Sequence, residues 1–177
     1  METIETYKVN LRDMQQDTYS CEYVLNDEFF KSINAPDIRK GSMHVHLDVR
    51  KSAGGFILCF HTWGQVTVPC DRCLDDLELY VDTTNTLKVK FGAEFSDEEE
   101  VVTIPEEGYI DIAWFLYEFI VLSLPMQRMH EQGKCNADMM HVLNRHSYHE
   151  NDNISSSQET EEIDPRWSEL KKILDNN

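Results

Sequence analysis

The 177-residue sequence predicts an α+β protein in which an antiparallel β-meander forms a curled or barrel-like sheet covered by one long apolar helix. Two observations predict this class. Apolar and polar residues alternate through most of the first ninety positions, as in half-buried strands, and the apolar spacing becomes helical after residue 110. We expect the sheet to curl because a long open edge invites aggregation.

The predicted strands follow one another with few interruptions. Residues 4–11 and 19–25 alternate, and residues 27–33 form a short helix that Asn26 or Asp27 caps. Residues 43–49 and 56–68 make a hairpin with its turn at 52–55. Two further strands, at 77–81 and 87–91, are expected on either side of residues 83–85, which completes the meander.

The long apolar helix begins after Asp111, which can cap it, and ends at Pro125. Its apolar residues fall at helical spacing: Ile112, Phe115, Leu116, Phe119 and Leu122. The apolar segment 110–126, which contains this helix, carries Asp111 and Glu118 and is shorter than the roughly 20 apolar residues of a membrane span. With no signal-peptide pattern at the N-terminus, we expect a cytoplasmic protein without a membrane partner.

The chain divides into three predicted parts: a single α+β domain over residues 1–149, an acidic flexible linker over 150–163, and an amphipathic helix over 164–177. Asp164 is the expected N-cap of this last helix, with Pro165 in the first helical position. Its apolar face then docks either on its own domain or on a partner.

Charge is distributed unevenly along the chain, which has a net charge of -17. Residues 94–107 hold seven acids and residues 150–164 hold six, and neither run contains Lys or Arg. The remaining residues are nearly balanced, with 20 acids against 16 Lys and Arg. The runs are either solvated loops or a polyanion offered to a basic partner, and DNA is not an expected partner.

The sequence VPCDRCLDD contains two cysteines two residues apart, Cys70 and Cys73. Such a pair supplies half of a tetrahedral zinc site, and His130 with Cys135 are the best candidates for the other half. Two alternatives stay open: a redox pair, or a turn whose thiols pack as small apolar groups. No Ser-His-Asp order, phosphate loop or H-E-x-x-H motif occurs, so the sequence does not indicate an enzyme.

Taken together, the C-x-R-C-L core at Cys70–Leu74, the acidic middle and the closing Asp164-Pro165-Arg166-Trp167 resemble the YceD family, the large ribosomal RNA subunit accumulation proteins. The resemblance implies a non-enzymatic ribosome biogenesis factor that supports large-subunit rRNA levels. The family does not imply how such a factor acts, and two mechanisms fit: binding of a basic ribosomal protein, which the charge distribution favours, or contact with pre-ribosomal RNA. The alternatives are a zinc-binding RNA-contact module and a thiol redox protein. The expected partner or RNA contacts are Arg72, Leu74, Asp164, Arg166 and Trp167.

Overall fold

The computed structural model describes residues 7–92, 101–105 and 108–147. The chain forms two compact units, Met1–Met140 and His141–Asn177. The first unit contains the strands and the helices α1 and α2 of the described chain, and α3 (Ala137–His146) crosses the boundary. The expected linker at 150–163 and helix at 164–177, with Asp164, Arg166 and Trp167, lie outside the described residues.

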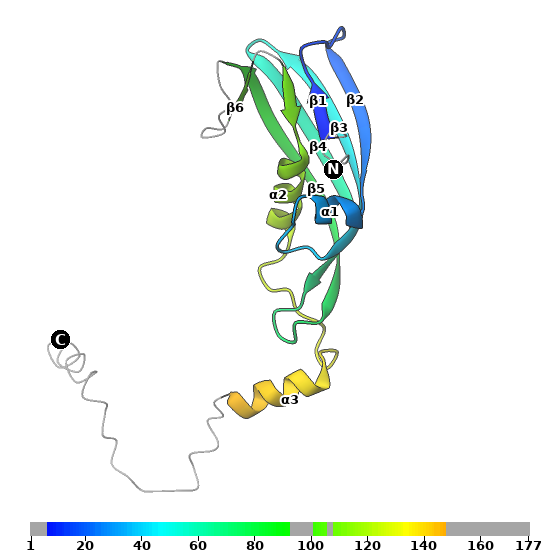
Figure 1. The fold of residues 1–177 in the computed structure, drawn as a ribbon, viewed down its shortest axis with the longest axis vertical. Coiled ribbons are helices and arrows are strands. Elements are labelled where there is room, and N and C mark those ends of the chain that lie inside the picture. The colour runs from blue at the N-terminus through cyan, green and yellow to red at the C-terminus, as the bar shows by residue number, and fades with distance from the viewer. Residues whose placement is uncertain (1–6, 93–100, 106–107, 148–177) are drawn as a thin grey trace, which may run out of the picture. The chain divides into compact units, whose positions relative to one another are not determined.

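The main sheet contains five strands in the order β2 (Thr18–Leu25), β3 (Lys40–Ser52), β4 (Gly55–Pro69), β5 (Asp76–Phe91) and β6 (Val101–Ile104). The first four are antiparallel neighbours, so the predicted meander is confirmed for them, while β6 runs parallel to β5 (Figure 1). The sheet is therefore mixed.

The expected barrel-like closure is wrong, because the sheet stays open between the edge strands β2 and β6. The first strand does not join it: β1 (Lys8–Asn10) pairs with β7 (Tyr109–Asp111) in a separate two-stranded sheet. One edge strand, β6, has only four residues. A short edge strand offers few unpaired backbone groups to another chain, so closure is not needed to protect it.

The expected interruption at residues 83–85 is also absent, because β5 is one continuous strand of 16 residues. Thr83 pairs with Thr62 and Asn85 with Phe60 of the long strand β4. Threonine favours strands, and pairing along a continuous neighbour also holds Asn85 in the strand, although asparagine has a low strand propensity.

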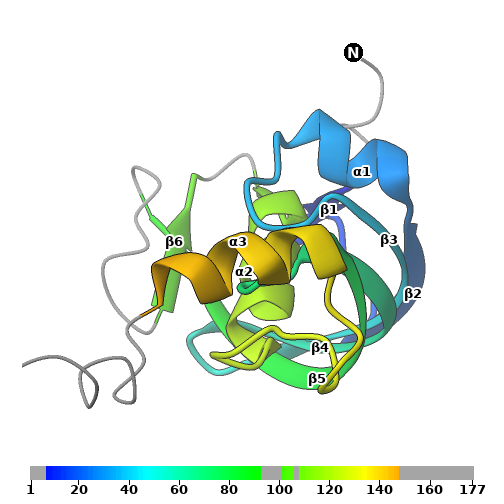
Figure 2. The same ribbon diagram turned by 90° about the horizontal axis from the view of Figure 1, so that it is seen from below.

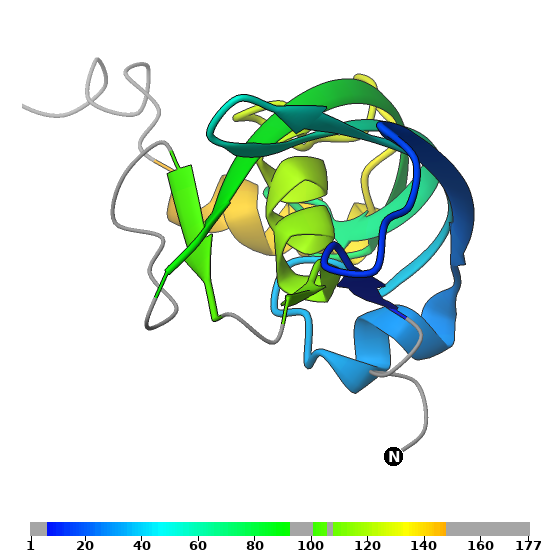
Figure 3. The ribbon, with the colours of Figure 1, turned by 90° about the horizontal axis from the view of Figure 1, so that it is seen from above.

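The core lies within the curl of the sheet, where α2 (Ala113–Ser123) packs (Figure 3). This helix has 11 residues and is not the long helix expected from the sequence. Asp111 Oδ1 accepts a hydrogen bond from Ala113 N at 2.9 Å, and the helix ends two residues before Pro125. Its buried side chains include Leu116 and Ile120.

The short helix α1 (Asp27–Ser32) lies beside β2 and β3 (Figure 2). Asn26 caps it, since its Oδ1 accepts a hydrogen bond from Phe29 N at 3.1 Å. Phe29 and Phe30 are both buried in the core. None of the helices in the described ranges is long and apolar enough to span a bilayer.

Candidate metal centre

The two cysteines lie in a tight turn between β4 and β5, which we call the Cys turn (residues 70–75). Leu74 N donates to Cys70 O and Cys70 N donates to Asp75 O, both at 2.9 Å. Leu74 has a positive φ of 64°, which a non-glycine residue rarely adopts and which reverses the chain toward β5. Cys70 and Cys73 are buried, whereas Arg72 and Leu74 between and after them are exposed.

The segment that follows α2 is fastened to the Cys turn by reciprocal hydrogen bonds. Asp71 N donates to Arg128 O, and Arg128 N donates to Asp71 Oδ2, both at 2.7 Å. Arg128 Nε also lies 3.6 Å from Asp71 Oδ1. At the far end of the segment, Asn136 Nδ2 donates to Asp75 Oδ2 at 3.1 Å. These contacts bring residues 128–136 against a turn 57 residues earlier in the chain.

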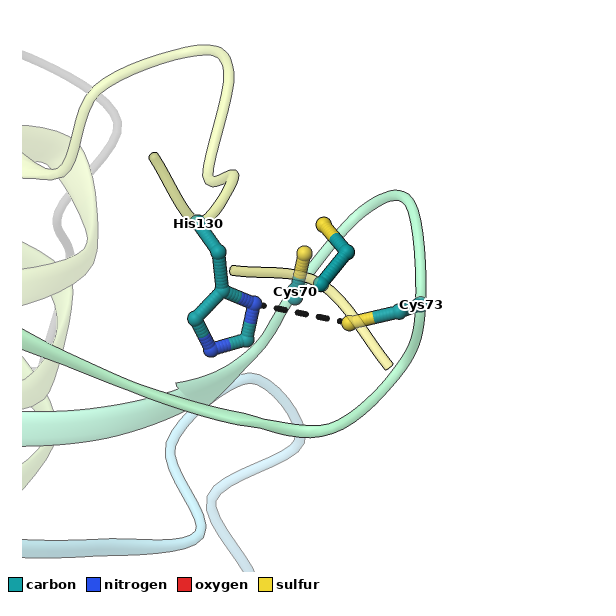
Figure 4. A group of neighbouring side chains, drawn as sticks. Cys70, Cys73 and His130 are labelled. Atoms are coloured by element: carbon teal, nitrogen blue, oxygen red, sulfur yellow. Dashed lines mark hydrogen bonds between the residues drawn. The ribbon is translucent and has the colours of Figure 1, made fainter. Parts of the chain in front are cut away.

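The result is a cluster of four side chains, and they are the four that the sequence nominated. One ligand atom from each of Cys70, Cys73, His130 and Cys135 lies within 4.8 Å of the other three. Cys73 Sγ and His130 Nδ1 are 3.4 Å apart, and Figure 4 shows the imidazole turned toward the two cysteines of the turn. Cys70 and Cys73 are buried, and His130 and Cys135 are partly exposed.

The imidazole of His130 is held in this orientation from its other side. Its Nε2 lies 3.2 Å from the carbonyl oxygen of Asp76, to which an N–H at that position donates. Nδ1 is then left with its lone pair directed at the thiols. A metal-binding histidine usually has such a second partner, which selects the tautomer and fixes the ring.

The electrostatics of the cluster favour a thiolate at Cys70. Burial acts to raise the pKa of this thiol, but hydrogen bonds from the backbone amides of Cys73, His130 and Arg72 outweigh burial and lower it to about 6. The hydrogen bond to Cys70 raises the pKa of His130 above its usual value. Desolvation raises the pKa of Cys135 to about 11, and hydrogen bonds with the two thiols of the turn act in the same direction.

These residues fit a zinc ion in both chemistry and spacing. Three thiols and one imidazole form a common ligand set for structural zinc, and bonds of about 2.0 to 2.3 Å put tetrahedral ligands roughly 3.5 to 3.8 Å apart. The separation of 3.4 Å between Cys73 Sγ and His130 Nδ1 is close to that range. The other separations stay below 4.8 Å, so a small contraction would complete a tetrahedron.

The surroundings of the cysteine pair differ from those of a thioredoxin-like redox pair. That chemistry places the first cysteine at a helix N-terminus in a βαβ unit. Here the pair joins two antiparallel strands, and Cys70 is completely buried. A buried sulfur at a strand turn is better placed to bind an ion from within than to attack a substrate from solvent.

Sequence reasoning missed the residues that bring the two halves of the cluster together. Asp71 lies inside the cysteine motif, but nothing in the sequence indicated that it would bind Arg128. Asp75 and its partner Asn136, which also accepts hydrogen bonds at the start of α3, were missed for the same reason. Only the cysteines themselves carried a local signal.

Residues 58–174, about two thirds of the chain, match the family model for the large ribosomal RNA subunit accumulation protein YceD. The chain belongs to the YceD family. The match includes all four residues of the cluster. Neither the curated proteins nor the solved structures include a match to the chain.

The family is named for the accumulation of large-subunit ribosomal RNA, and it is not a known enzyme family. If the four residues bound a tetrahedral ion, they would leave it no open position for substrate, as in structural zinc sites. The cluster therefore has the composition of a structural centre.

Proposed function

We propose that this protein is a non-enzymatic assembly factor in which zinc, bound by Cys70, Cys73, His130 and Cys135, fixes the Cys turn as a contact element for a basic ribosomal protein. The convergence of these four ligand atoms within 4.8 Å carries the proposal. A structural ion would lock together two chain segments that hydrogen bonds and an ion pair already hold side by side. Its binding energy would then contribute directly to the folding of this region.

The Cys turn is suited to contact because it presents two exposed side chains from a restrained backbone. Leu74 is 59% exposed, although its backbone is held by Cys70 O, and its own carbonyl accepts a hydrogen bond from Arg39 Nη2 at 3.2 Å. Arg72 is exposed in the same turn. An exposed guanidinium on a restrained turn resembles the arginine anchors found at protein interfaces.

Charge supports a basic partner. The chain carries a net charge of -17, and acids are concentrated at residues 94–107 and 150–164. Such a surface attracts the Lys- and Arg-rich proteins that bind rRNA, and it repels the phosphates of RNA. The affinity for such a partner would decrease steeply as salt is added.

One observation favours a second candidate, direct contact with pre-ribosomal RNA. Arg72 is an exposed cation on the turn itself, and a guanidinium can pair with phosphate. The two candidates differ in the direct partner. It is a basic ribosomal protein in the first and pre-ribosomal RNA in the second.

Metal analysis of the full-length protein, purified without chelator, tests the centre. We expect about one equivalent of zinc per chain, the stoichiometry of a closed four-ligand site. Less than about a tenth of an equivalent, also after refolding with added zinc, would exclude the zinc part of the proposal.

A pull-down from the native cell at low salt, with and without ribonuclease, tests the partner. A basic ribosomal protein that stays bound after ribonuclease supports the escort function, and loss of all bound material with the RNA supports the second candidate. The double variant Arg72→Ala, Leu74→Ser should reduce capture in either case. Arg50→Ala, which removes an exposed arginine from β3, is the matched control.

A further inference from the structure

Helix α2 has an unusual composition for a helix with one side open to solvent. Glu118 is its only charged residue, and most of the other residues are apolar. A helix that is apolar all round is normally buried on all sides. In the described structure, however, Trp114 is 50% exposed and Leu122 is 80% exposed.

These exposed residues form a continuous surface. Trp114, Glu118 and Leu122 are four residues apart and therefore lie along one face of the helix, with the half-buried Val121 beside them. We call this face the outer strip. The opposite side of α2, with Leu116 and Ile120, packs into the curl of the sheet (Figure 3). The outer strip therefore faces away from the core.

The aromatic residue of the strip is held in place before any partner binds. Trp114 Nε1 donates to Glu118 Oε1 at 2.7 Å, and its ring lies 5.1 Å from the ring of Tyr117. The hydroxyl of Tyr117 in turn donates to Asp37 Oδ2 at 3.0 Å. A tryptophan with its orientation fixed loses little conformational entropy on binding, which is the property of an interface anchor.

The sequence around α2 carries only negative charges. Between Lys90 and Arg128 the sequence contains nine acids and no Lys, Arg or His. Among the described residues of this stretch, Asp111 precedes the helix and Glu118 lies in the strip. An apolar strip that includes an acid, on a chain with a net charge of -17, is complementary to a segment that carries both apolar anchors and positive charges.

We propose that the outer strip of α2 binds a basic amphipathic helix of a partner protein, with Trp114 and Leu122 contacting its apolar face and Glu118 its Lys and Arg. This inference rests on the proposed function for the basic character of the partner. It adds a second contact surface that is separate from the Cys turn and from the metal cluster.

Two synthetic peptides of identical Leu and Lys composition test the proposal with the full-length protein. One, about five helical turns long, has Leu at helical spacing, and the other has the same residues scrambled. Fluorescence anisotropy of the labelled peptides gives both affinities at low salt. We expect the helically spaced peptide to bind roughly tenfold more tightly, because attraction to the acidic chain alone does not distinguish the two.

Substitutions then locate the binding surface. Trp114→Ala and Leu122→Ser should each remove most of the preference for the helically spaced peptide. Tyr80→Ala and Val24→Ser are the matched controls, since Tyr80 is 66% and Val24 57% exposed on other elements. Leu122 is so exposed that its replacement leaves the core intact, so this test does not depend on whether Trp114→Ala folds.

Several results would overturn the proposal. Equal binding of the two peptides to the wild type would show attraction by charge alone, and an unchanged preference in Leu122→Ser would place the binding surface elsewhere. A wild-type dimer that Leu122→Ser dissociates in sedimentation velocity would show that a second copy covers the strip. If strip variants still capture a ribosomal protein normally, this inference fails while the proposed function stands.

Discussion

Inside the curl of the sheet Leu47, Phe60 and Leu116 are completely buried, whereas no residue between Pro125 and Ser147 is buried. The first region is held by the hydrophobic effect and by close packing, which need no ligand. The segment around Arg128 and His130 is held by hydrogen bonds and by the ion pairs of Arg128 with Asp37 and Asp71, and it brings four ligand atoms together. The proposed zinc site therefore predicts that the sheet folds by itself, while the Cys turn and its partner segment depend on the ion.

Phe60→Ala should have the largest effect on the free energy of unfolding. Phe60 is completely buried, and its ring lies 5.4 Å from that of Phe119. Removing such a side chain leaves a cavity and costs about 3–5 kcal/mol. Urea denaturation followed by circular dichroism measures the loss. Tyr80→Ala, an exposed aromatic on β5, is the control and should change stability by less than about 0.5 kcal/mol.

A loss below about 1 kcal/mol for Phe60→Ala would mean that the sheet interior is not the main source of stability. The contrast between the two regions would then be wrong.

Cys73→Ser should strongly affect zinc binding and the order of residues 128–136, but it should have little effect on the stability of the main sheet. We expect bound zinc to fall below a tenth of an equivalent, because a serine hydroxyl is a poor zinc ligand. Hydrogen exchange should become fast for the amides of residues 128–136 and stay slow in β3 and β4. Cys59→Ser, a half-buried cysteine of β4 outside the cluster, should retain zinc.

Equally fast exchange in β3 and β4 of the Cys73→Ser variant would contradict local control by the metal. The two regions would then form a single cooperative unit.

Asp71→Asn tests the residues that bring the two halves together. The amide oxygen can still accept a hydrogen bond from Arg128 N, but the attraction between Asp71 and the Arg128 guanidinium is lost. Changes next to metal ligands typically weaken binding by about 10- to 100-fold. Competition with a chromophoric chelator gives the affinity. Asp48→Asn on β3 is the control, and a similar loss there would disprove a specific role for Asp71.

Lowering the pH should release zinc in two stages. Cys135, with a pKa raised to about 11, holds its proton at neutral pH and must lose it on binding, so affinity should decrease by about tenfold or more per pH unit. As the pH falls through about 6, the Cys70 thiolate also takes up a proton, and the decrease should become steeper. The metal-linked stability is thus present at higher pH and lost on acidification.

A chelator titration at several pH values measures this dependence. An affinity that stays constant between pH 8 and pH 5.5 would show that these thiols do not bind the ion.

Much of the sheet could be predicted because strand alternation is a local property. Met43, Val45 and Leu47 alternate with polar neighbours, and β3 places all three in the core. The parallel direction of β6 and the pairing of β1 with β7 could not be predicted, since both depend on where the chain returns after segments without periodicity. The strand β5 continues through Asn85 because it pairs along the length of β4, which no local pattern in its own residues indicated.

For the candidate site, the sequence predicted the kinds of ligand atoms and not the way they are held. A thiol and an imidazole five residues apart are recognisable as ligands anywhere in a chain. Asp71 and Arg128 are 57 positions apart, and Asp75 and Asn136 are 61 positions apart. No local sequence pattern predicts contacts over such distances. The exposure of Trp114 and Leu122 could not be predicted either, because the apolar sequence of α2 is typical of a buried helix.

By itself, the sequence determined the strand periods, the four nominated ligand residues, the acidic runs and the family motif. These depend only on the order of residues and on the chemistry of each one. Only the tertiary structure decided that the sheet stays open, that the four ligand atoms meet, and that one face of an apolar helix remains uncovered. Those outcomes depend on packing and hydrogen bonds between distant segments, which are decided when the whole chain folds and not by any stretch of it.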